Sequence, residues 1–239
     1  LGDASPEFRE FVWKTQIPTT VTLMGLGALP ETDPLALKMP GMHGSRAANY
    51  AFQDCDLIIA VGSRFDDRVT GKLEKFAPNA KIIHIDIDPS AISKNVHVDI
   101  PIVGHVKRVL PMLTEMVDKT DVDAWRHQCA MWKERYPFRF EPKPDVIKPQ
   151  QVIEEIWDIT RGDAILATDV GQHQMWAGQH YQHIEPRRWL TSGGLGTMGY
   201  GMPAALGAQL AAPDDLVVCI SGDGSIMMNI QELTTLVTE

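Results

Sequence analysis

The chain has 239 residues, 44% of them hydrophobic and 22% charged, with a net charge of −9 at pH 7. This composition is typical of a globular protein with one large or two ordinary domains, and the negative charge disfavours duplex nucleic acid or an anionic membrane surface as a partner. Cys55, Cys129 and Cys219 lie far apart without CxxC spacing, which argues against a disulfide framework or a structural zinc site and favours a reducing compartment. The longest apolar run is too short to cross a membrane.

The first half of the sequence is predicted to alternate helices and strands. Helices are predicted at residues 6–15, 44–54 and 106–117, and strands at residues 17–23, 56–62, 80–88 and 96–104. The strand segments "DLIIAVG" and "AKIIHIDID" are apolar runs, as expected for strands that are buried on both faces. In the last helix, apolar residues recur at i, i+3, i+4, i+7 and i+11, which indicates an amphipathic helix.

A polar stretch separates this half from the next. Residues 119–148 contain Pro137, Pro142 and Pro144, so we expect a short helix at residues 125–135 and then a linker. Alternation then resumes, with helices predicted at residues 150–160, 172–181, 200–212 and 225–237 and strands at residues 163–171, 187–192 and 215–221. Because repeated βα units imply parallel sheets with right-handed crossovers, the sequence predicts an α/β protein with two doubly wound units.

One glycine turn, in "VVCISGDGSIMMNIQEL" at residues 217–233, joins a predicted strand to a predicted helix. Glycines let the backbone approach a phosphate, and a helix N-terminus offers free N–H groups. The carboxylate of Asp223 would repel a bare phosphate, but Mg²⁺ between the two groups would bind both. The turn therefore indicates a metal–diphosphate site. The alternative is an ordinary turn in which Asp223 caps the helix, and the three residues "GDG" alone favour that alternative.

Two more glycine-containing segments follow predicted strands. They are "SGGLGTMGYGMPAALGAQLA" at residues 192–211 and "TDVGQHQMW" at residues 168–176. Ligands of parallel α/β sheets bind beyond the carboxyl ends of the strands. We therefore expect the ends of these strands to face one crevice.

These segments resemble a known family. "VGQHQMW", "SGGLGTMGYGMPAALGA" and "GDGSIMMNIQEL" are similar to the pyrophosphate-binding domain of thiamine-diphosphate-dependent enzymes, specifically the acetohydroxyacid synthase (acetolactate synthase) large subunits. "TLMGLGALP", "MPGMHGSRAANYA", "DLIIAVGSRFDDRVTGKLEKFAP" and "KIIHIDIDPSAISKN" resemble the middle, FAD-binding domain of that family. The resemblance extends along nearly the whole chain. It implies a Rossmann-like FAD domain at residues 1–118, a linker with a short helix at 119–148, and the first part of the pyrophosphate-binding domain at 149–239.

For the second half, the resemblance implies thiamine diphosphate and Mg²⁺ as cofactors. Asp223 matches the metal ligand, and Met198 matches the methionine that holds the cofactor in its bent form. The implied cofactor-binding residues are Gln172, His173, Gly196, Met198, Gly222, Asp223, Gly224 and Ser225. Without the resemblance, His173 would be taken for a solvated residue at a helix start and Met198 for core filler. The family's second metal ligand, an asparagine, lies beyond the 16 residues that follow Asp223 (239 − 223 = 16).

For the first half, the resemblance implies FAD. The implied contacts are Thr22, Leu23, Met24, Gly41, Met42, His43, Gly44, Gly62, Arg64, Asp66, Arg68, Val69, Asp86, Asp88, Gly104 and His105. An alternative for His84, Asp86 and Asp88 is a metal cluster, because alternate residues share one face of a strand. Arg64, Arg68, Lys72 and Lys75 can also be explained as a solvated helix face, which we prefer for the two lysines.

The sequence departs from the family pattern at two points. The family has Gly-Asp where this chain has Gly104-His105, so the contact on the adenine side of FAD is left open. The glycine-rich segment that precedes the middle-domain helix in the family is not present, so part of the FAD phosphate site is missing.

The resemblance implies an enzyme that decarboxylates pyruvate on thiamine diphosphate and joins the two-carbon unit to a second 2-keto acid. The products would be acetolactate or acetohydroxybutyrate, in branched-chain amino acid biosynthesis. The family also implies a homodimer or tetramer and a cytoplasmic location, or a plastid location in a eukaryote, and it leaves open whether a small regulatory subunit binds. We expect none of the catalytic acid–base residues to lie in this chain.

Other functions are possible in principle. Glyoxylate carboligase and pyruvate oxidase are related thiamine-diphosphate enzymes, but "RFDDRVTGKL" and "MPGMHG" argue against them. A third alternative is a noncatalytic nucleotide-binding or oligomerisation module. The chain begins "LGDASPEFREF", without an initiator methionine, and ends soon after the "GDG" turn. We therefore expect a fragment of a larger protein that is inactive alone.

Overall fold

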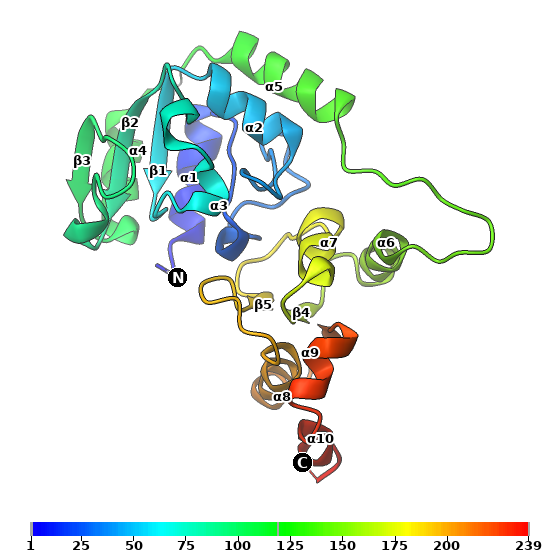
Figure 1. Ribbon diagram of the computed structural model, residues 1–239. Coiled ribbons are helices and arrows are strands. Elements are labelled where there is room, and N and C mark those ends of the chain that lie inside the picture. Colours follow the sequence, from blue (N-terminus) through cyan, green and yellow to red (C-terminus); the bar gives the residue numbers. More distant parts are fainter. Residues whose placement is uncertain (1, 119, 239) are drawn as a thin grey trace. The chain divides into compact units, whose positions relative to one another are not determined.

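The computed structural model describes residues 2–118 and 120–238, and the chain forms two compact units (Figure 1). The first unit contains the chain up to Thr22 and residues 33–137, and the second contains residues 23–32 and the chain from Phe138 onward. Each unit has a parallel sheet, so the prediction of an α/β fold with two parallel sheets is confirmed. In the described part of the chain, no helix combines the length and the apolar character that a membrane crossing would need.

The first unit has a parallel sheet with helices on both faces. Its described strands are β1 (Leu57–Val61), β2 (Lys81–Asp86) and β3 (Ile100–Val103), hydrogen-bonded in the order β1-β2-β3. Its helices are α1 (Ser5–Thr15), α2 (Arg46–Asp54), α3 (Asp67–Thr70), α4 (Val106–Met116) and α5 (Asp123–Arg135), with short 3₁₀ turns η2 (Leu73–Lys75) and η3 (Pro89–Ala91).

Alternation along β1 divides the core of this unit into two layers. Ile58 belongs to a hydrophobic cluster against which Phe52 of α2 packs, whereas its neighbour Ile59 packs against a second cluster, which contains Phe11 of α1 and Leu110 of α4. Successive strand residues point to opposite faces of a sheet, so both faces of β1 are covered by helices. The unit is therefore doubly wound, as the uninterrupted apolar runs of its strands predict.

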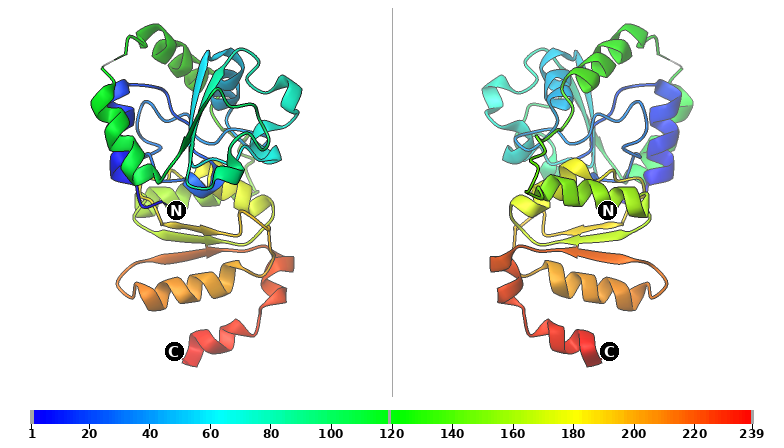
Figure 2. Two further views of the ribbon diagram at one scale, coloured as in Figure 1. Left: turned by 90° about the vertical axis from the view of Figure 1, so that its left-hand side faces the viewer. Right: turned by 90° about the vertical axis from the view of Figure 1, so that its right-hand side faces the viewer.

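The second unit repeats this plan with a smaller sheet. Its described strands are β4 (Ile165–Thr168), β5 (Trp189–Thr191) and β6 (Val217–Ile220), in the order β5-β4-β6. Its helices are α6 (Pro149–Thr160), α7 (Gln172–His180), α8 (Gly201–Ala211), α9 (Asp223–Met228) and α10 (Glu232–Thr238). Figure 2 shows α6 and α8 on opposite sides of the strands. Every residue of β4 is buried, because this strand lies between the other two.

A segment from the first half of the sequence is built into the second unit. Residues 23–32 include the 3₁₀ turn η1 (Leu23–Gly25). The N–H of Glu31 donates to the carbonyl of His183 at 2.9 Å, and the N–H of His183 donates to Oε2 of Glu31 at 3.1 Å. These paired hydrogen bonds fix the segment although 152 positions separate the two residues. The domain limits at 118 and 149 stay predictions, since contacts divide the chain near 137 with this segment exchanged.

Two predicted elements are wrong. No strand forms at residues 17–23, where Thr19 alone makes a parallel bridge, to Ala36. The β-branched residues of this segment favour an extended backbone, but a strand also requires a neighbour along its whole length. The helix predicted at 225–237 is interrupted between α9 and α10, and there the side chain of Asn229 donates to the carbonyl of Gly199 instead of facing solvent.

The stability of the first unit is expected to depend on pH through His84, which lies on β2 and is fully buried. Burial lowers the pKa of His84, although the carboxylate of Asp86, with Oδ2 3.8 Å from Nε2, opposes the shift. Below about pH 6.5 the unfolded chain binds a proton at this position before the folded chain does. His84 therefore makes the free energy of unfolding fall as the pH falls through this range.

We expect His84→Phe to reduce the loss of unfolding free energy between pH 7 and pH 5, by up to roughly 1 kcal/mol per pH unit. Urea unfolding at the two pH values measures the difference. His97→Gln, at an exposed position, is the control and is expected to follow the unmodified protein. If His84→Phe loses as much stability as the unmodified protein, the prediction is wrong.

Candidate functional site

In the second unit, the carboxyl ends of β4 and β6 meet at the imidazole of His173. A Cβ atom on Gly171, before α7, would lie 2.9 Å from Cε1 of His173. A Cβ atom on Gly222, after β6, would lie 3.0 Å from the same atom. Any larger residue at either position would displace the ring, so both glycines are needed for the contact. The "GQH" and "GDG" segments are therefore adjacent, as their positions after two parallel strands predict.

The glycine-rich segment between β5 and α8 reaches the same turn. A Cβ atom on Gly224 would lie 3.6 Å from Cε of Met198, which is ordinary van der Waals contact. The side chain of Met198 is 40% exposed, so this methionine is not part of the core. All the segments predicted to bind the diphosphate thus meet in one place.

Asp223 is exposed at the start of α9. Gly222, and not Asp223, is the N-cap residue, and no side chain caps this helix end. Among the described residues, the Asp223 carboxylate makes no hydrogen bond or ion pair. The alternative that Asp223 serves as a helix cap is therefore not supported. An exposed, uncommitted carboxylate beside a glycine turn is a suitable ligand for Mg²⁺.

A cation at Asp223 would need further ligands that the described side chains do not provide. No cluster of three or more His, Cys, Asp or Glu side chains suited to a metal occurs in the described residues. Phosphate oxygens and water commonly complete the octahedral shell of Mg²⁺. The donor set of this unit therefore fits a cation that arrives with a diphosphate, and it does not fit a metal held by the protein alone.

Asp169, which is not among the residues predicted from the sequence, directly follows β4 and is fully buried. Its Oδ1 accepts hydrogen bonds from the N–H groups of Gly199, at 2.7 Å, and Val170, at 3.0 Å. Its Oδ2 accepts from the N–H of Gly201, at 3.0 Å, and from the hydroxyl of Ser221, at 3.4 Å. An acidic residue directly after a buried strand, at the ligand-binding edge of a parallel sheet, was the signal that could have identified it.

The surroundings of the His173 imidazole affect both its pKa and its hydrogen bonding. Burial lowers its pKa, and the nearby Asp169 carboxylate and backbone oppose this shift. The neutral imidazole has one donor and one acceptor nitrogen. Nε2 is buried and has no hydrogen-bond partner among the described residues. A polar atom without a partner at the meeting point of two strand ends is consistent with contact to a bound group.

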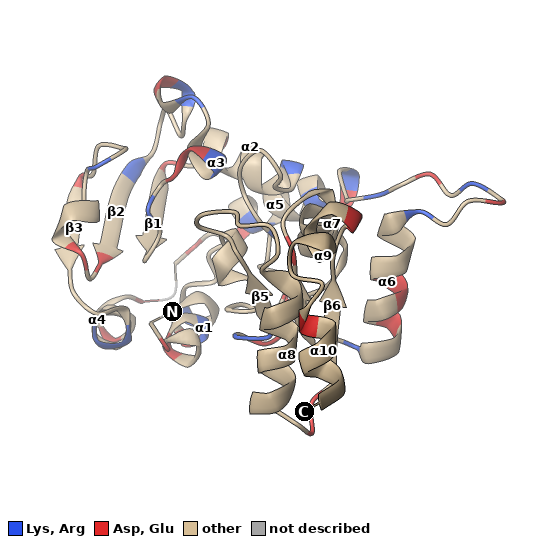
Figure 3. Ribbon diagram, turned by 60° about the horizontal axis from the view of Figure 1, so that its bottom comes forward, with Lys and Arg blue, Asp and Glu red and all other residues tan. Residues whose placement is uncertain are grey.

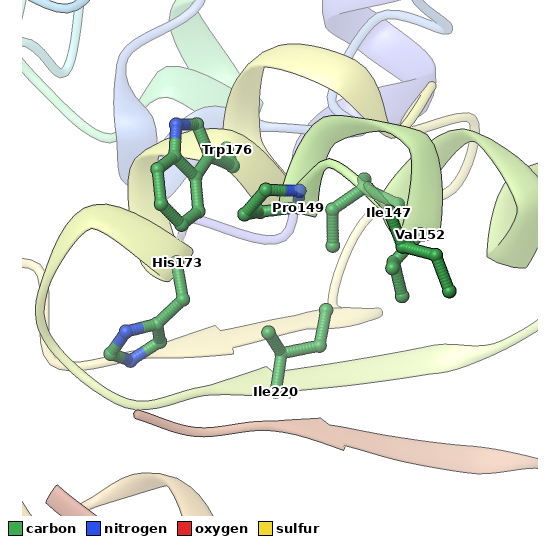
Figure 4. Close-up of a pocket in the computed structure, with 7 residues that line it drawn as sticks. Ile147, Pro149, Val152, His173, Trp176 and Ile220 are labelled. Carbon is green, nitrogen blue, oxygen red and sulfur yellow. The ribbon is translucent and has the colours of Figure 1, made fainter. Parts of the chain in front are cut away.

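His173 also lines a pocket of about 310 Å³ (Figure 4). Figure 4 shows His173 and Trp176 on α7, with Pro149 and Ile147 beside α6 and Ile220 on the strand below. The pocket is lined by Ile147, Pro149, Val152, Ile153, His173, Trp176 and Ile220. Apart from the imidazole and the indole N–H, this lining is apolar. The pocket therefore suits an apolar group, and the diphosphate is expected on the side of the glycine turns.

The remaining predicted residues of this unit are placed as follows. Gln172 is exposed at the start of α7, and Gly196 is exposed with a positive φ of 67°. Ser225 is buried, and its hydroxyl donates to the carbonyl of Val170 at 3.4 Å. The Ser225 side chain therefore joins the two strand ends and does not face solvent.

In the first unit, the structure brings together two of the segments predicted to bind FAD. The N–H of Met42 donates to the carbonyl of Arg68 at 3.0 Å. Gly41 has φ of 93°, and a Cβ atom there would overlap the Arg68 carbonyl and approach Val69. The segment that contains His43 and Gly44 therefore lies against α3, which carries Arg68 and Val69. The side chains of Arg64 and Arg68 are exposed.

Other predicted flavin residues meet at the ends of β2 and β3. The N–H of Gly104 donates to the carbonyl of Asp86 at 2.9 Å, and the N–H of Asp88 donates to Oδ1 of Asp86 at 2.9 Å. Nδ1 of His105 accepts from the N–H of Lys107 at 3.2 Å, so His105 caps α4. Figure 3 shows basic residues on this helix. A pocket of about 480 Å³ is lined by Ile87, His105, Lys107 and Arg108.

The structure does not support a metal cluster of His84, Asp86 and Asp88. His84 is fully buried. The carboxylate of Asp88 accepts a hydrogen bond from the N–H of Ser90 at 2.8 Å, and hydrogen bonding by Ser90 lowers the pKa of Asp88. His84 is thus enclosed in the core, and the carboxylate of Asp88 is used by the turn that follows β2.

The last flavin residues are divided between the units. Gly62, Arg64 and Asp66 follow β1, and Thr22 also belongs to the first unit. Leu23 and Met24 belong to the second unit, where a Cβ atom on Gly193 would overlap Sδ of Met24. Met24 therefore contacts the glycine-rich segment.

Comparison with known proteins gives a consistent result. Residues 1–113 match the thiamine pyrophosphate enzyme central domain, and residues 169–239 match the C-terminal thiamine pyrophosphate binding domain of these enzymes. The chain is 52% identical over 240 aligned residues to the acetolactate synthase large subunit of Haemophilus influenzae, covering 98% of this chain and 42% of the relative. It is 49% identical to the Escherichia coli isozyme 2 large subunit, covering 98% of this chain and 42% of the relative.

A plant relative is equally similar. Acetolactate synthase 2, chloroplastic, of Nicotiana tabacum is 51% identical, and the match covers 100% of this chain and 37% of the relative. The chain thus spans about two fifths of the length of the curated relatives that it matches.

The contact between α8 and β4 leads to a test with a matched control. A Cβ atom on Gly201 would lie 2.7 Å from the backbone nitrogen of Asp169, whereas one on Gly207, in the same helix, would have nothing within 4 Å. We expect Gly201→Ala to lower the free energy of unfolding by about 1–3 kcal/mol, because the helix must move off the strand end. Gly207→Ala should raise it by roughly 0.5–1 kcal/mol. Chemical denaturation measures both, and equal effects of the two substitutions would show that the close contact is not a constraint.

Proposed function

We propose that this chain, which belongs to the thiamine pyrophosphate enzymes, is part of an acetolactate synthase large subunit. The observation that carries the proposal is that His173, Met198 and the Gly222–Gly224 turn meet beside the uncommitted carboxylate of Asp223. The whole enzyme would decarboxylate pyruvate and join the two-carbon unit to a second 2-keto acid. The products would be acetolactate or acetohydroxybutyrate, which lead to branched-chain amino acids.

In this proposal the chain binds and orients the cofactor. Thiamine diphosphate, when bound, supplies the carbanion chemistry of the reaction. Asp223 offers a carboxylate to Mg²⁺, whose charge offsets that of the diphosphate. Gly222 and Gly224 leave the backbone open to the phosphates, and His173 presents a ring nitrogen without a partner. The exposed Met198 offers an apolar contact to the cofactor. We assign no acid–base step to this chain.

We propose the first unit as the FAD site. The support is that the segments 41–44 and 64–69 lie together and that the ends of β2 and β3 adjoin a pocket with basic residues. The carboxyl ends of parallel strands are the usual place for a nucleotide. The basic side chains of Lys107 and Arg108 suit the diphosphate of a dinucleotide.

The names of the relatives guide the remaining proposals. Because they are large subunits, we propose a small regulatory subunit as a partner and a homodimer or tetramer as the assembly. The matches are to bacterial proteins and to a chloroplastic plant protein, so we propose a cytoplasmic location in a bacterium or a plastid location in a plant.

The metal role of Asp223 can be tested in the full-length protein. We expect Asp223→Asn to weaken the apparent affinity for Mg²⁺ by about 10–100-fold, because a neutral amide, unlike a carboxylate, does not neutralise the positive charge of the cation. Acetolactate formation from pyruvate, titrated with Mg²⁺ at saturating thiamine diphosphate, is the measurement. Asp214→Asn, an exposed change at the amino end of β6, is the control. An unchanged Mg²⁺ titration for Asp223→Asn would show that Asp223 is not a ligand of Mg²⁺.

The isolated chain provides a second test. Because the chain spans about two fifths of its relatives, we expect the 239-residue polypeptide to form no acetolactate from pyruvate with thiamine diphosphate, Mg²⁺ and FAD. The full-length protein should form it under the same conditions, and omitting FAD should reduce the activity. Turnover by the isolated polypeptide would contradict the first expectation, and an inactive full-length protein would contradict the proposed function.

A further inference from the structure

The buried carboxylate of Asp169 links parts of the second unit that are distant in the sequence. Its hydrogen bonds reach Gly199, Gly201 and Ser221, which lie 30, 32 and 52 positions further along the chain. The carboxylate therefore holds the ends of β4 and β6 and the start of α8 together. A buried charge is costly unless hydrogen bonds satisfy it, and here backbone N–H groups and a hydroxyl do so.

The residues that Asp169 holds are the immediate neighbours of the proposed cofactor residues. Gly199 follows Met198, and Ser221 precedes Gly222. The side chain of Asn229, at the end of α9, also donates to the carbonyl of Gly199. Both the N–H and the carbonyl of Gly199 are therefore held by hydrogen bonds. The separation of Met198 from the "GDG" turn is thus fixed through hydrogen bonds to Asp169.

Asp169 also occupies the positive end of α8. The N–H of Gly201, the first residue of that helix, points at Oδ2 of Asp169. A helix N-terminus attracts anions, but here the chain's own carboxylate already satisfies it. A diphosphate therefore cannot accept a hydrogen bond from the N–H of Gly201 while Asp169 does. It would bind at the turns after β4 and β6.

We propose that Asp169 is a positioning residue, which sets the distance between Met198 and the Gly222–Gly224 turn and thereby the affinity for the Mg²⁺–diphosphate group. This inference rests on the proposed function. Asparagine has nearly the same shape, but it would place an amide donor against backbone N–H donors. The substitution should therefore loosen the glycine segment without emptying the space.

The test compares two buried substitutions in the full-length protein. Asp169→Asn replaces one of the two acceptor oxygens that link the segments with an amide donor. Thr168→Val, at the adjacent fully buried position, removes a hydroxyl whose hydrogen bond goes to Thr191 within the sheet, at 2.8 Å. Both should lower the melting temperature. We expect only Asp169→Asn to raise the dissociation constant of thiamine diphosphate with Mg²⁺, by at least tenfold, as measured by calorimetry.

A dissociation constant for Asp169→Asn within twofold of the unmodified protein would overturn the inference, as would equal weakening by Thr168→Val. If Asp169→Asn does not fold, Ser221→Ala replaces it. Ser221→Ala removes one donor to the carboxylate and should raise the dissociation constant at least twofold, so an unchanged value would also overturn the inference.

Hydrogen exchange separates this inference from the proposed function. In the protein without cofactor, Asp169→Asn should speed exchange of at least one of the Gly199 and Gly201 amides, because asparagine keeps only one of the two acceptor oxygens, and Thr168→Val should not. If the unmodified protein does not bind thiamine diphosphate, the proposed function fails. If it binds and the variants behave alike in both measurements, the role of Asp169 fails.

Discussion

The second unit depends on one buried carboxylate and on a set of glycines that allow backbone and ring atoms to approach each other closely. Asp169 collects N–H groups from segments that are far apart in the sequence, and Gly201 lets α8 begin directly against the end of β4. Gly171 and Gly222 leave room for the His173 ring between them. The contact of Gly201 is with backbone atoms of β4 and Asp169, which cannot rotate aside, whereas a larger residue at Gly171 or Gly222 would displace the His173 ring. The geometry at this edge of the sheet is therefore set by the covalent chain and not by interchangeable core packing.

The first unit reaches a comparable arrangement by different means. Its core is a conventional one, in which alternate residues of β1 pack against helices on opposite faces. At its carboxyl edge, loops are joined by backbone hydrogen bonds, such as that from Met42 to Arg68, and by short local turns around Asp86 and Asp88. Several charged side chains there, including Arg64 and Arg68, are exposed. Exposed charges on a fixed backbone are what recognition of a large anionic nucleotide would require.

The sequence predicted most elements because their periodicity is local information. The apolar runs of β1, β2 and β4 and the amphipathic stripe of α4 identify strands and a helix without knowledge of their neighbours. The strand predicted at 17–23 failed because only Thr19 finds a partner, and a partner is not encoded in the segment itself. The single helix predicted at 225–237 failed because Asn229 is bound to Gly199, 30 positions away. The exchange of residues 23–32 into the second unit is equally non-local, since it rests on hydrogen bonds between Glu31 and His183.

The two aspartates at the carboxyl edge of the second sheet show why part of the candidate site could be predicted and part could not. Asp223 stands in a recognisable turn, is exposed, and makes no hydrogen bond or ion pair with the described residues. Asp169 directly follows a buried strand, is itself buried, and accepts hydrogen bonds on both oxygens. A carboxylate whose lone pairs are used by the protein has none left for a cation, and an uncommitted one cannot hold loops together. The two requirements conflict within a single side chain, so the fold divides them between two residues. The turn around Asp223 is recognisable in the sequence, whereas the position of Asp169 after β4 indicates the edge of the sheet but not its hydrogen-bond partners, which lie 30 or more positions away.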